Sequence, residues 1–417
     1  MDMKWIALAI TVLMYAFVIA FPKKKAYASL SAAALLVFLG AVSPARALGT
    51  HVNWNVLAVF VGSLIMADLF IYSRVPERVA DAIVNRSRDV GVAIVSILVM
   101  TGLISAFVEN VATVLVMAPI ALALCAKTGI KPTYFLTGLA VMANLQGTAT
   151  LVGDSPSLIF ASFAGYTFND FFVYRGTLSI FFIIQTGMLA GAAFFYAHFA
   201  RERSGKITLE RTSIVSPFPA ILLVSMISTL ALVSFLGFGA PPSSGIIVSA
   251  HAAIGLAWFR LARKESASRA LDVIKRVDWD AFAFLVGIFV VVGAIADQGL
   301  LADLSGLLSR AIGDHVLVGF IAIIAVSLAV SGFVDNVPYI VAMLPVAANL
   351  SSSLGINGEL YLFALLVGSC LGGNLTPFGA SSNVVASGIL GKQGVPMTFG
   401  AWLKIGLPFT LITTIAS

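Results

Sequence analysis

"SGFVDNVPYIVAMLP", residues 331–345, places an aspartate and an asparagine inside a long apolar stretch. "SAFVENVATVLVMAP", residues 105–119, has the same frame: phenylalanine, valine, an acid, asparagine and valine, then a proline at the same distance. The acids, Glu109 and Asp335, lie 226 residues apart, as do the residues that match around them. The repetition indicates that the chain contains one structural unit twice, with a carboxylate at an equivalent place in each copy.

The composition identifies the environment of these stretches. Of the 417 residues, 59% are hydrophobic and 11% are charged, and the mean hydropathy is +1.02, whereas about a quarter of the residues of a soluble domain are charged. Stretches near 20 residues, long enough to cross a hydrocarbon core about 30 Å thick, lie at 3–21, 28–45, 54–73, 177–199, 219–237, 243–259, 279–296 and 398–417. The period-2 alternation of a membrane barrel is absent. The sequence predicts an all-α polytopic membrane protein.

The 226-residue frame continues beyond the two opening stretches. "GTATLVGDSPS", residues 147–157, aligns with "GNLTPFGASSN", residues 373–383. Upstream, tryptophan and glycine pairs match with an offset of 225, which implies one inserted residue. We therefore expect two copies, 1–200 and 214–417, joined by a polar linker at 201–213.

Each copy is predicted to hold three helices, a helix pair broken at the acid-Asn site, an interrupted segment and a closing helix. The broken pairs span about 90–126 and 315–349, and the interrupted segments about 132–166 and 358–390. Whether each broken pair crosses the membrane or turns back decides how the two copies are oriented.

The basic residues favour a pair that turns back. If each pair is a re-entrant hairpin, 21 of the 25 basic residues share one side, in the loops Lys23–Lys25, Arg74–Arg88, Lys127–Lys131, Arg201–Arg211, Arg260–Arg276 and Lys392–Lys404. Basic residues in short loops mark the cytoplasmic side of a membrane. We therefore expect a protein of the cell (inner) membrane with its N-terminus on the outside. Five crossings per copy is an odd number, which makes the copies inverted repeats. The net charge of +6 then reports topology, and no nucleic-acid partner is expected.

Several function classes lack the residues they need. The chain has no GxxxxGK[ST] motif and no soluble region large enough for a nucleotide-binding domain, so neither an ATPase nor another enzyme is expected. Cys125 and Cys370 make no disulfide framework, and the four histidines show no metal-ligand spacing. We expect no cofactor and no metal. Energy for transport must come from an ion gradient or from the gradient of the substrate itself.

Inverted repeats with interrupted helices indicate a secondary transporter whose site lies near the membrane midplane, between the breaks. An ionisable group at the bilayer centre costs at least about 2.5 kcal/mol and usually faces a pathway, so Glu109 and Asp335 are candidate ion ligands. The alternative is that each acid is protonated and caps a helix. Asn110 and Asn336 offer a donor and an acceptor, which suits a hairpin tip touching an ion or a purely structural turn.

Asp154 has no acidic counterpart, because the second copy has Ala380. It could bind one coupling ion or proton, or cap the helix that begins at Pro156. Asp68, which matches Gly293, is either a proton relay or a helix-packing residue. Hydroxyl, amide and glycine positions at the tips and breaks complete the predicted ion site: Thr113, Gly147, Thr148, Thr150, Ser155, Asn374, Thr376, Ser381, Ser382 and Asn383.

Four motifs together resemble the ion transporter superfamily: "ISAFVENVATVLVMAP", "GTATLVGDSPSLI", "FVDNVPYIVAMLP" and "GSCLGGNLTPFGASSNVVASGI". They look most like the branch of ArsB-type arsenite/antimonite permeases, the melanosomal P protein and NhaD-type sodium/proton antiporters. The resemblance implies scaffold helices at 1–75 and 214–298, transport elements at 88–199 and 312–417, an elevator-type motion and a homodimer in the lipid bilayer.

Departures from the superfamily shape the functional expectation. Sodium-coupled carboxylate symporters carry Ser-Asn-Thr at both tips, where this chain has Glu109-Asn110-Val111 and Asp335-Asn336-Val337. A second carboxylate should repel a dicarboxylate. We therefore expect proton-coupled efflux of a small inorganic ion, with arsenite or antimonite first. Sodium/proton antiport follows, then sodium-coupled dicarboxylate or sulfate symport, and a channel is the alternative from another class. Proton coupling is expected at Glu109, Asp154 and Asp335.

Overall fold

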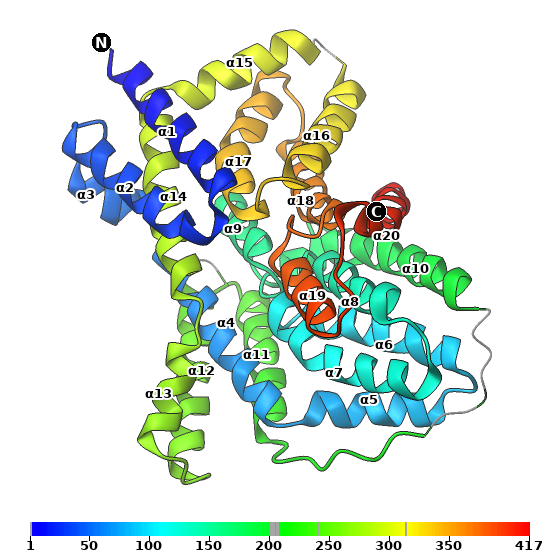
Figure 1. The fold of residues 1–417 in the computed structure, drawn as a ribbon. Coiled ribbons are helices and arrows are strands. Elements are labelled where there is room, and N and C mark those ends of the chain that lie inside the picture. Colours follow the sequence, from blue (N-terminus) through cyan, green and yellow to red (C-terminus); the bar gives the residue numbers. More distant parts are fainter. Residues whose placement is uncertain (1, 201–204, 206–207, 240–241, 313–314) are drawn as a thin grey trace.

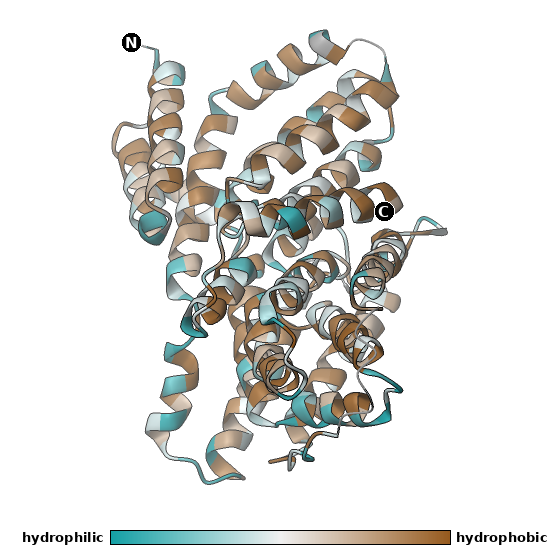
Figure 2. Cartoon of the chain, turned by 45° about the vertical axis from the view of Figure 1, so that its right-hand side comes forward, coloured by the Kyte–Doolittle hydropathy of each residue, from teal (hydrophilic) through white to brown (hydrophobic). Residues whose placement is uncertain are grey.

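A computed structural model describes residues 2–200, 205, 208–239, 242–312 and 315–417. Within these residues, nine helices are long and apolar enough to cross a membrane. Figure 2 shows that the helices consist mostly of apolar residues and that hydrophilic residues gather near helix ends and in connections. The described part of the chain is therefore a multi-pass, all-α membrane protein apart from one short hairpin of β1 (Val173–Tyr174) and β2 (Thr177–Leu178).

The helices of the two halves follow the same order. The first half contains α1 (Met3–Ala20), η1 (Pro22–Lys24), α2 (Lys25–Phe38), α3 (Pro44–Arg46), η2 (Ala47–His51), α4 (Trp54–Tyr72), α5 (Val75–Arg86), α6 (Val90–Ser105), α7 (Asn110–Thr128), α8 (Pro132–Gly147), α9 (Ser155–Ala164), η3 (Asn169–Phe171) and α10 (Ile180–Phe199). The second half contains α11 (Phe218–Phe235), α12 (Ser243–Leu261), α13 (Ala267–Lys275), α14 (Trp279–Asp297), α15 (Leu300–Ile312), α16 (Val316–Ser331), α17 (Asn336–Ser353), α18 (Gly358–Gly372), η4 (Gly373–Leu375), α19 (Ser381–Lys392) and α20 (Phe399–Ala416).

Two equivalent helices, α4 and α14, begin with equivalent caps. The side chain of Asn53 accepts the backbone N–H of Val56 at the start of α4, and that of Asp278 accepts the N–H of Ala281 at the start of α14. Such caps satisfy N–H groups that have no partner in the first turn of a helix. The duplication seen in the sequence thus extends to how these two helices start.

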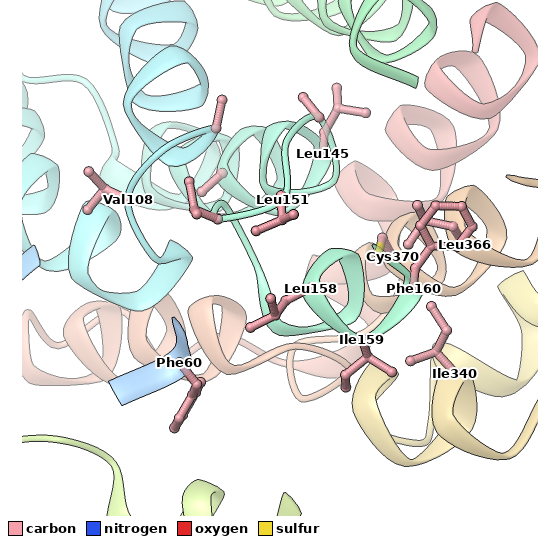
Figure 3. Close-up of a cluster of buried hydrophobic side chains, with 14 of the residues drawn as sticks. Phe60, Val108, Leu145, Leu151, Leu158, Ile159, Phe160, Ile340, Leu366 and Cys370 are labelled. Carbon is pink, nitrogen blue, oxygen red and sulfur yellow. The ribbon is translucent and has the colours of Figure 1, made fainter. Parts of the chain in front are cut away.

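The two halves interlock. Helix α2 packs against α14 of the other half, and α12 packs against α4 in the same way. Helix α9 packs against α17, and α19 packs against α7. Figure 3 shows this exchange for α9, where Ile159 and Phe160 lie beside Ile340 and Leu366 of the second half. Each half therefore contributes helices to both sides of the central region.

The helices form two groups in Figure 1. Helices α1–α4 and α11–α14 lie on one side, and α6–α8, α10, α16, α18 and α20 lie on the other. The short helices α5 and α15 connect the groups at opposite edges of the molecule. Helices α9, α17 and α19 lie between, where both groups approach the centre.

Parts of the structure differ from the sequence prediction. The second helix, expected at 28–45, runs from Lys25 to Phe38, because Gly40 has a positive φ of 78° and Ser43 caps the next turn. Helices α5, α13 and α15 lie in segments predicted as loops, since their apolar residues are interleaved with charged ones. Of the predicted linker 201–213, residues 201–204 and 206–207 lie outside the described residues.

Candidate functional site

In both broken helix pairs an acid caps the start of the second helix. Four residues separate α6 from α7, and four separate α16 from α17. Glu109 accepts a hydrogen bond from the N–H of Ala112 at 3.0 Å, and Asp335 accepts one from Val337 at 3.2 Å. A carboxylate at this place offsets the free N–H groups and the positive end of the helix. Each acid uses one oxygen as a cap and keeps the other for a second partner.

Asn110 and Asn336 follow the acids at the tips of the two broken pairs, and a serine at the end of the preceding helix holds each of them. Ser105 Oγ donates to Asn110 Oδ1 at 2.7 Å, and Ser331 Oγ donates to Asn336 Oδ1 at 2.5 Å. A Cβ added at Gly147 would lie 2.4 Å from Asn110 Oδ1, so any larger residue there would require Asn110 or the backbone to move. The side chains of Asn110 and Asn336 are buried, and a serine hydroxyl holds the oxygen of each.

Threonine hydroxyls fasten the breaks to the tips. Thr150 Oγ1 donates to the carbonyl oxygen of Ala106, and Thr376 Oγ1 donates to that of Gly332 at 2.6 Å. The other two predicted threonines each donate to a carbonyl four residues earlier: Thr113 and Thr148. All four hydroxyls are buried and engaged with backbone, which places them in the packing around the site.

A buried asparagine joins the two breaks and was not predicted. Asn144 of α8 donates through Nδ2 to Asn374 Oδ1 at 2.9 Å and to Asn383 Oδ1 at 3.0 Å, and its Oδ1 accepts from Ser382 Oγ. The position equivalent to Asn144 is Cys370, so the repeat gave no sign of it. A polar residue inside an otherwise apolar helix is the signal that sequence analysis could have used.

The third predicted acid is both a cap and a tip partner. Asp154 Oδ1 accepts the N–H of Ser155 at 2.8 Å, at the start of α9, and Oδ2 accepts Asn110 Nδ2 at 2.8 Å. In the second half Ala380 stands at the equivalent place, so α19 starts without a side-chain cap. The start of α19 therefore retains more of its positive partial charge than the starts of α7, α9 and α17, which have acidic caps.

One cavity of about 560 Å³ receives residues of both halves. Eight of the predicted site residues line it: Glu109, Asn110, Asp154, Ser155, Asp335, Asn336, Ser381 and Ser382. The other seven lie in the surrounding hydrogen-bonded structure: Thr113, Gly147, Thr148, Thr150, Asn374, Thr376 and Asn383. The structure thus brings the two tips, and the acid of the first break, to a common space.

A lysine that the sequence analysis assigned to a loop also lines this cavity. Lys25 begins α2, and its Nζ lies 2.8 Å from Asp335 Oδ2. Its side chain is 21% exposed, whereas its neighbours Lys23 and Lys24 are exposed. The run of three lysines after an apolar stretch resembles a topology signal. The need of an acid within the membrane for a counter-charge is what could have singled out one of them.

A second ion pair lies at the edge of the cavity. Asp68 of α4 and Arg276, which follows α13, are 3.6 Å apart. Asp68, Ile71, Val273 and Arg276 also line a neighbouring cavity of about 390 Å³. Asp68, expected as a proton relay or a packing residue, therefore lies with its arginine between two cavities.

The charge of the main cavity is unbalanced. Among its described lining residues, five side chains are acidic and two are basic. The acids are Asp68, Glu109, Asp154, Asp278 and Asp335, and the bases are Lys25 and Arg276. Within the described chain no group of three or more histidines, cysteines or acids is placed to hold a metal, and Cys125 and Cys370 are free and buried. The excess of acidic side chains makes this cavity more favourable for cations and protons than for an anion alone.

Comparisons with known proteins agree along nearly the whole chain. The family model described as "Citrate transporter" matches residues 15–368. The uncharacterized transporter Rv2684 of Mycobacterium tuberculosis is 31% identical over 99% of this chain and 96% of its own length. The P protein of Homo sapiens is 24% identical over 92% of this chain and 55% of its own length.

Two solved structures share the fold. The Alcanivorax borkumensis YdaH transporter superposes with a TM-score of 0.61 at 15% identity, over 92% of this chain and 86% of that one. MtrF of Neisseria gonorrhoeae, described within a class of antimetabolite efflux pumps, gives a TM-score of 0.57 at 15% identity, over 92% and 82% of the two chains. At this level of identity the likeness concerns architecture.

Proposed function

The chain belongs to the citrate transporter family of the ion transporter superfamily, and on that basis we propose that it exchanges a small inorganic cation, with sodium as the first candidate, for protons. Membership makes the chain a secondary membrane transporter and not an enzyme. It also has distant homologues in the P proteins, as the motifs predicted. The identity of the cargo and of the coupling ion is what the proposal adds.

The observation that carries the proposal is the convergence of three acids from both halves on one cavity. Glu109, Asp154 and Asp335 line it together with amide and hydroxyl groups, which are ligands for hard cations. Buried charges need a partner, and a cation or a proton can serve each acid in turn. A neutral arsenite molecule makes no use of three carboxylates, so arsenite/antimonite efflux, expected first from the sequence, ranks below cation exchange. The family and relatives described above give arsenite specificity no support.

Exchange follows from competition for the same oxygens. A protonated carboxyl group no longer attracts a cation, and a bound cation disfavours protonation. Glu109 is the most available of the acids, because among the described residues it pairs with no side chain and accepts hydrogen bonds only from backbone N–H groups at the start of α7, whereas Asp154 also accepts Asn110 Nδ2. A carrier that changes its access only when these acids are occupied moves cations one way and protons the other.

The two groups of helices correspond to a proposed scaffold and a proposed moving part. In this proposal the protein is an elevator-type homodimer built from two inverted repeats. The scaffold consists of residues 1–75 and 214–298, and the moving part consists of residues 88–199 and 312–417. The reciprocal packing of α2 on α14 and of α12 on α4 supports a common scaffold, and α5 and α15 are suited to connect it to the moving part. The second cavity, beside α13 and its basic loop, is the proposed cytoplasmic entrance, with Asp68 and Arg276 at its inner end.

The direct test uses purified protein in liposomes that contain a pH-sensitive dye in an acidic lumen. External sodium should raise the internal pH, because sodium enters as protons leave. The salts compared are those of sodium, lithium, potassium and choline, together with arsenite and antimonite. Asp303→Asn, which removes a 57% exposed acid outside the cavity, is the matched control and should respond like the natural chain. No response to any of these cations would remove the proposal.

One observation favours a second candidate, a carboxylate carried together with a cation. The start of α19 at Ser381 and Ser382 faces the cavity without an acidic cap, and Lys25 and Arg276 line the same space. A helix N-terminus attracts carboxylates, and the family description names citrate. Uptake of labelled citrate or succinate that requires an external cation would favour this candidate over exchange with protons.

A further inference from the structure

The pair formed by Lys25 and Asp335 joins the two groups of helices. Lys25 belongs to α2, and a Cβ added at Gly287 of α14 would lie 2.5 Å from the carbonyl carbon of Ser29, so the two backbones are in close contact. The Lys25 ammonium also lies 5.3 Å from the centre of the Phe284 ring of α14, within the range of a cation–π contact. The position of Lys25 is therefore set by α2 and α14, not by the tip that it touches.

Asp335, by contrast, belongs to the second tip, and both of its oxygens are occupied. Oδ1 accepts the N–H of Val337, and Oδ2 lies against Lys25. A further hydrogen bond runs in parallel, from the hydroxyl of Tyr15 in α1 to the carbonyl oxygen of Pro338 at 2.8 Å. In this state the second tip is attached to α1 and α2 by an ion pair and a hydrogen bond.

The first tip has no such attachment within the described chain. Glu109 makes its cap with Ala112 and forms no ion pair with any described residue. The two tips are thus alike in sequence and capping but differ in their relation to the surrounding helices. A purely structural role for the acids would need no such difference.

The other charged groups near the pair leave Lys25 as the partner of Asp335. Arg276, the second base of the cavity, is paired with Asp68. Asp278 caps α14, and Asp280 follows it in the first turn of that helix. Glu109 and Asp154 are the remaining charged groups of the lining. Repulsion among so many carboxylates makes an unpaired Asp335 costly.

We infer that Lys25 is a coupling residue: it pairs with Asp335 whenever that carboxylate holds neither a cation nor a proton, and so keeps an unloaded second tip attached to α2. The inference rests on the proposed cation/proton exchange. The Lys25 and Asp335 side chains are only 21% and 31% exposed, so moving the unloaded tip would separate two half-buried charges, which is unfavourable. A cation or a proton on Asp335 removes the attraction and frees the tip. Lys25 thereby prevents the moving part from crossing without a cation or a proton bound. Cations can then cross only in exchange for protons.

The test compares Lys25→Met, which removes the charge at similar length, with Lys25→Arg, which keeps it. Both variants are placed in liposomes, and labelled sodium and proton fluxes are measured together. We expect Lys25→Met to raise sodium flux that is not matched by protons by about tenfold, and Lys25→Arg to stay near the natural chain. Adding Lys25→Met to Asp335→Asn should change nothing further, because the partner is already neutral.

A second measurement needs no variant. An amine-reactive acylating reagent is applied to the natural protein, and modification of Lys25 is followed by mass spectrometry while sodium replaces choline at constant ionic strength. Sodium should increase the modification of Lys25 severalfold, since the ammonium loses its partner, while modification of the exposed Lys24 stays constant.

The outcomes separate the inference from the proposed function. If the natural chain exchanges no cation for protons, the proposed function fails and the inference fails with it. If the natural chain exchanges normally but Lys25→Met remains fully coupled, or sodium leaves the labelling of Lys25 unchanged, only the inference is overturned. A loss of coupling in Lys25→Met that Lys25→Arg does not share supports it.

Discussion

Glu109 and Asp335 illustrate how equivalent residues acquire different tasks. Both cap the second helix of a broken pair, and both line the same cavity. Asp335 is paired with a lysine from α2, whereas Glu109 pairs with no side chain of the described residues. At the residue scale we therefore expect the first tip to bind the cation more readily and the second tip to depend on whether Lys25 is paired with it.

Glu109→Gln should abolish the sodium response and leave the protein folded. The glutamine side-chain oxygen can still accept the N–H of Ala112, so the cap is retained, but the negative charge is lost. Dye-loaded liposomes and the melting temperature of the purified variant provide the two readouts. Unaltered exchange in a correctly folded Glu109→Gln protein would exclude this acid from the mechanism.

Gly147→Ala tests the close contact between tip and break. The new methyl group would lie 2.4 Å from Asn110 Oδ1, so Asn110 or the backbone must move, and overpacking of this kind costs about 1–3 kcal/mol. We expect a lower melting temperature and weaker sodium binding. Gly306→Ala in α15 is the control, because a Cβ there meets nothing within 4 Å. Equal stability of the two variants would contradict the described packing.

At the scale of elements, the break between α18 and α19 differs from that between α8 and α9 by one cap. Ala380→Asp would copy Asp154 into the second half. Among the starts of α7, α9, α17 and α19, only that of α19 has no acidic side-chain cap, and this variant would add one. If a carboxylate is a co-substrate, this variant should lose citrate or succinate uptake by about tenfold or more and should retain cation/proton exchange. Preserved uptake would show that the start of α19 does not bind the anion.

The sequence predicted the helices that are continuous apolar stretches and missed the helices in which apolar residues are mixed with polar ones. The apolar stretches at 54–73 and 279–296 correspond to α4 and α14. Helices α5, α13 and α15 were missed because they alternate apolar and charged residues over only two or three turns. The acids and asparagines of the two tips, Glu109, Asn110, Asp335 and Asn336, were found through the repeat. Lys25 and Asn144 were missed because neither recurs in the second half.

At the scale of the whole molecule, the proposed orientation places α13 on the cytoplasmic side and α15 on the opposite side. Ser268→Cys in α13 and Ala302→Cys in α15 put thiols at exposed positions, while the native Cys125 and Cys370 are buried. An impermeant thiol reagent added to intact cells should label position 302 and spare position 268 until the membrane is opened. Labelling of both positions from outside would contradict the inverted arrangement of the two halves.

The central claim is that cations and protons compete for the carboxylates between the two tips. Its most direct test is to add sodium to purified protein in weakly buffered detergent solution and to measure sodium binding and proton release in the same sample. The account predicts saturable binding with stoichiometric release of protons, and loss of both in Glu109→Gln. Binding of sodium without any release of protons, or release that persists in that variant, would contradict the account.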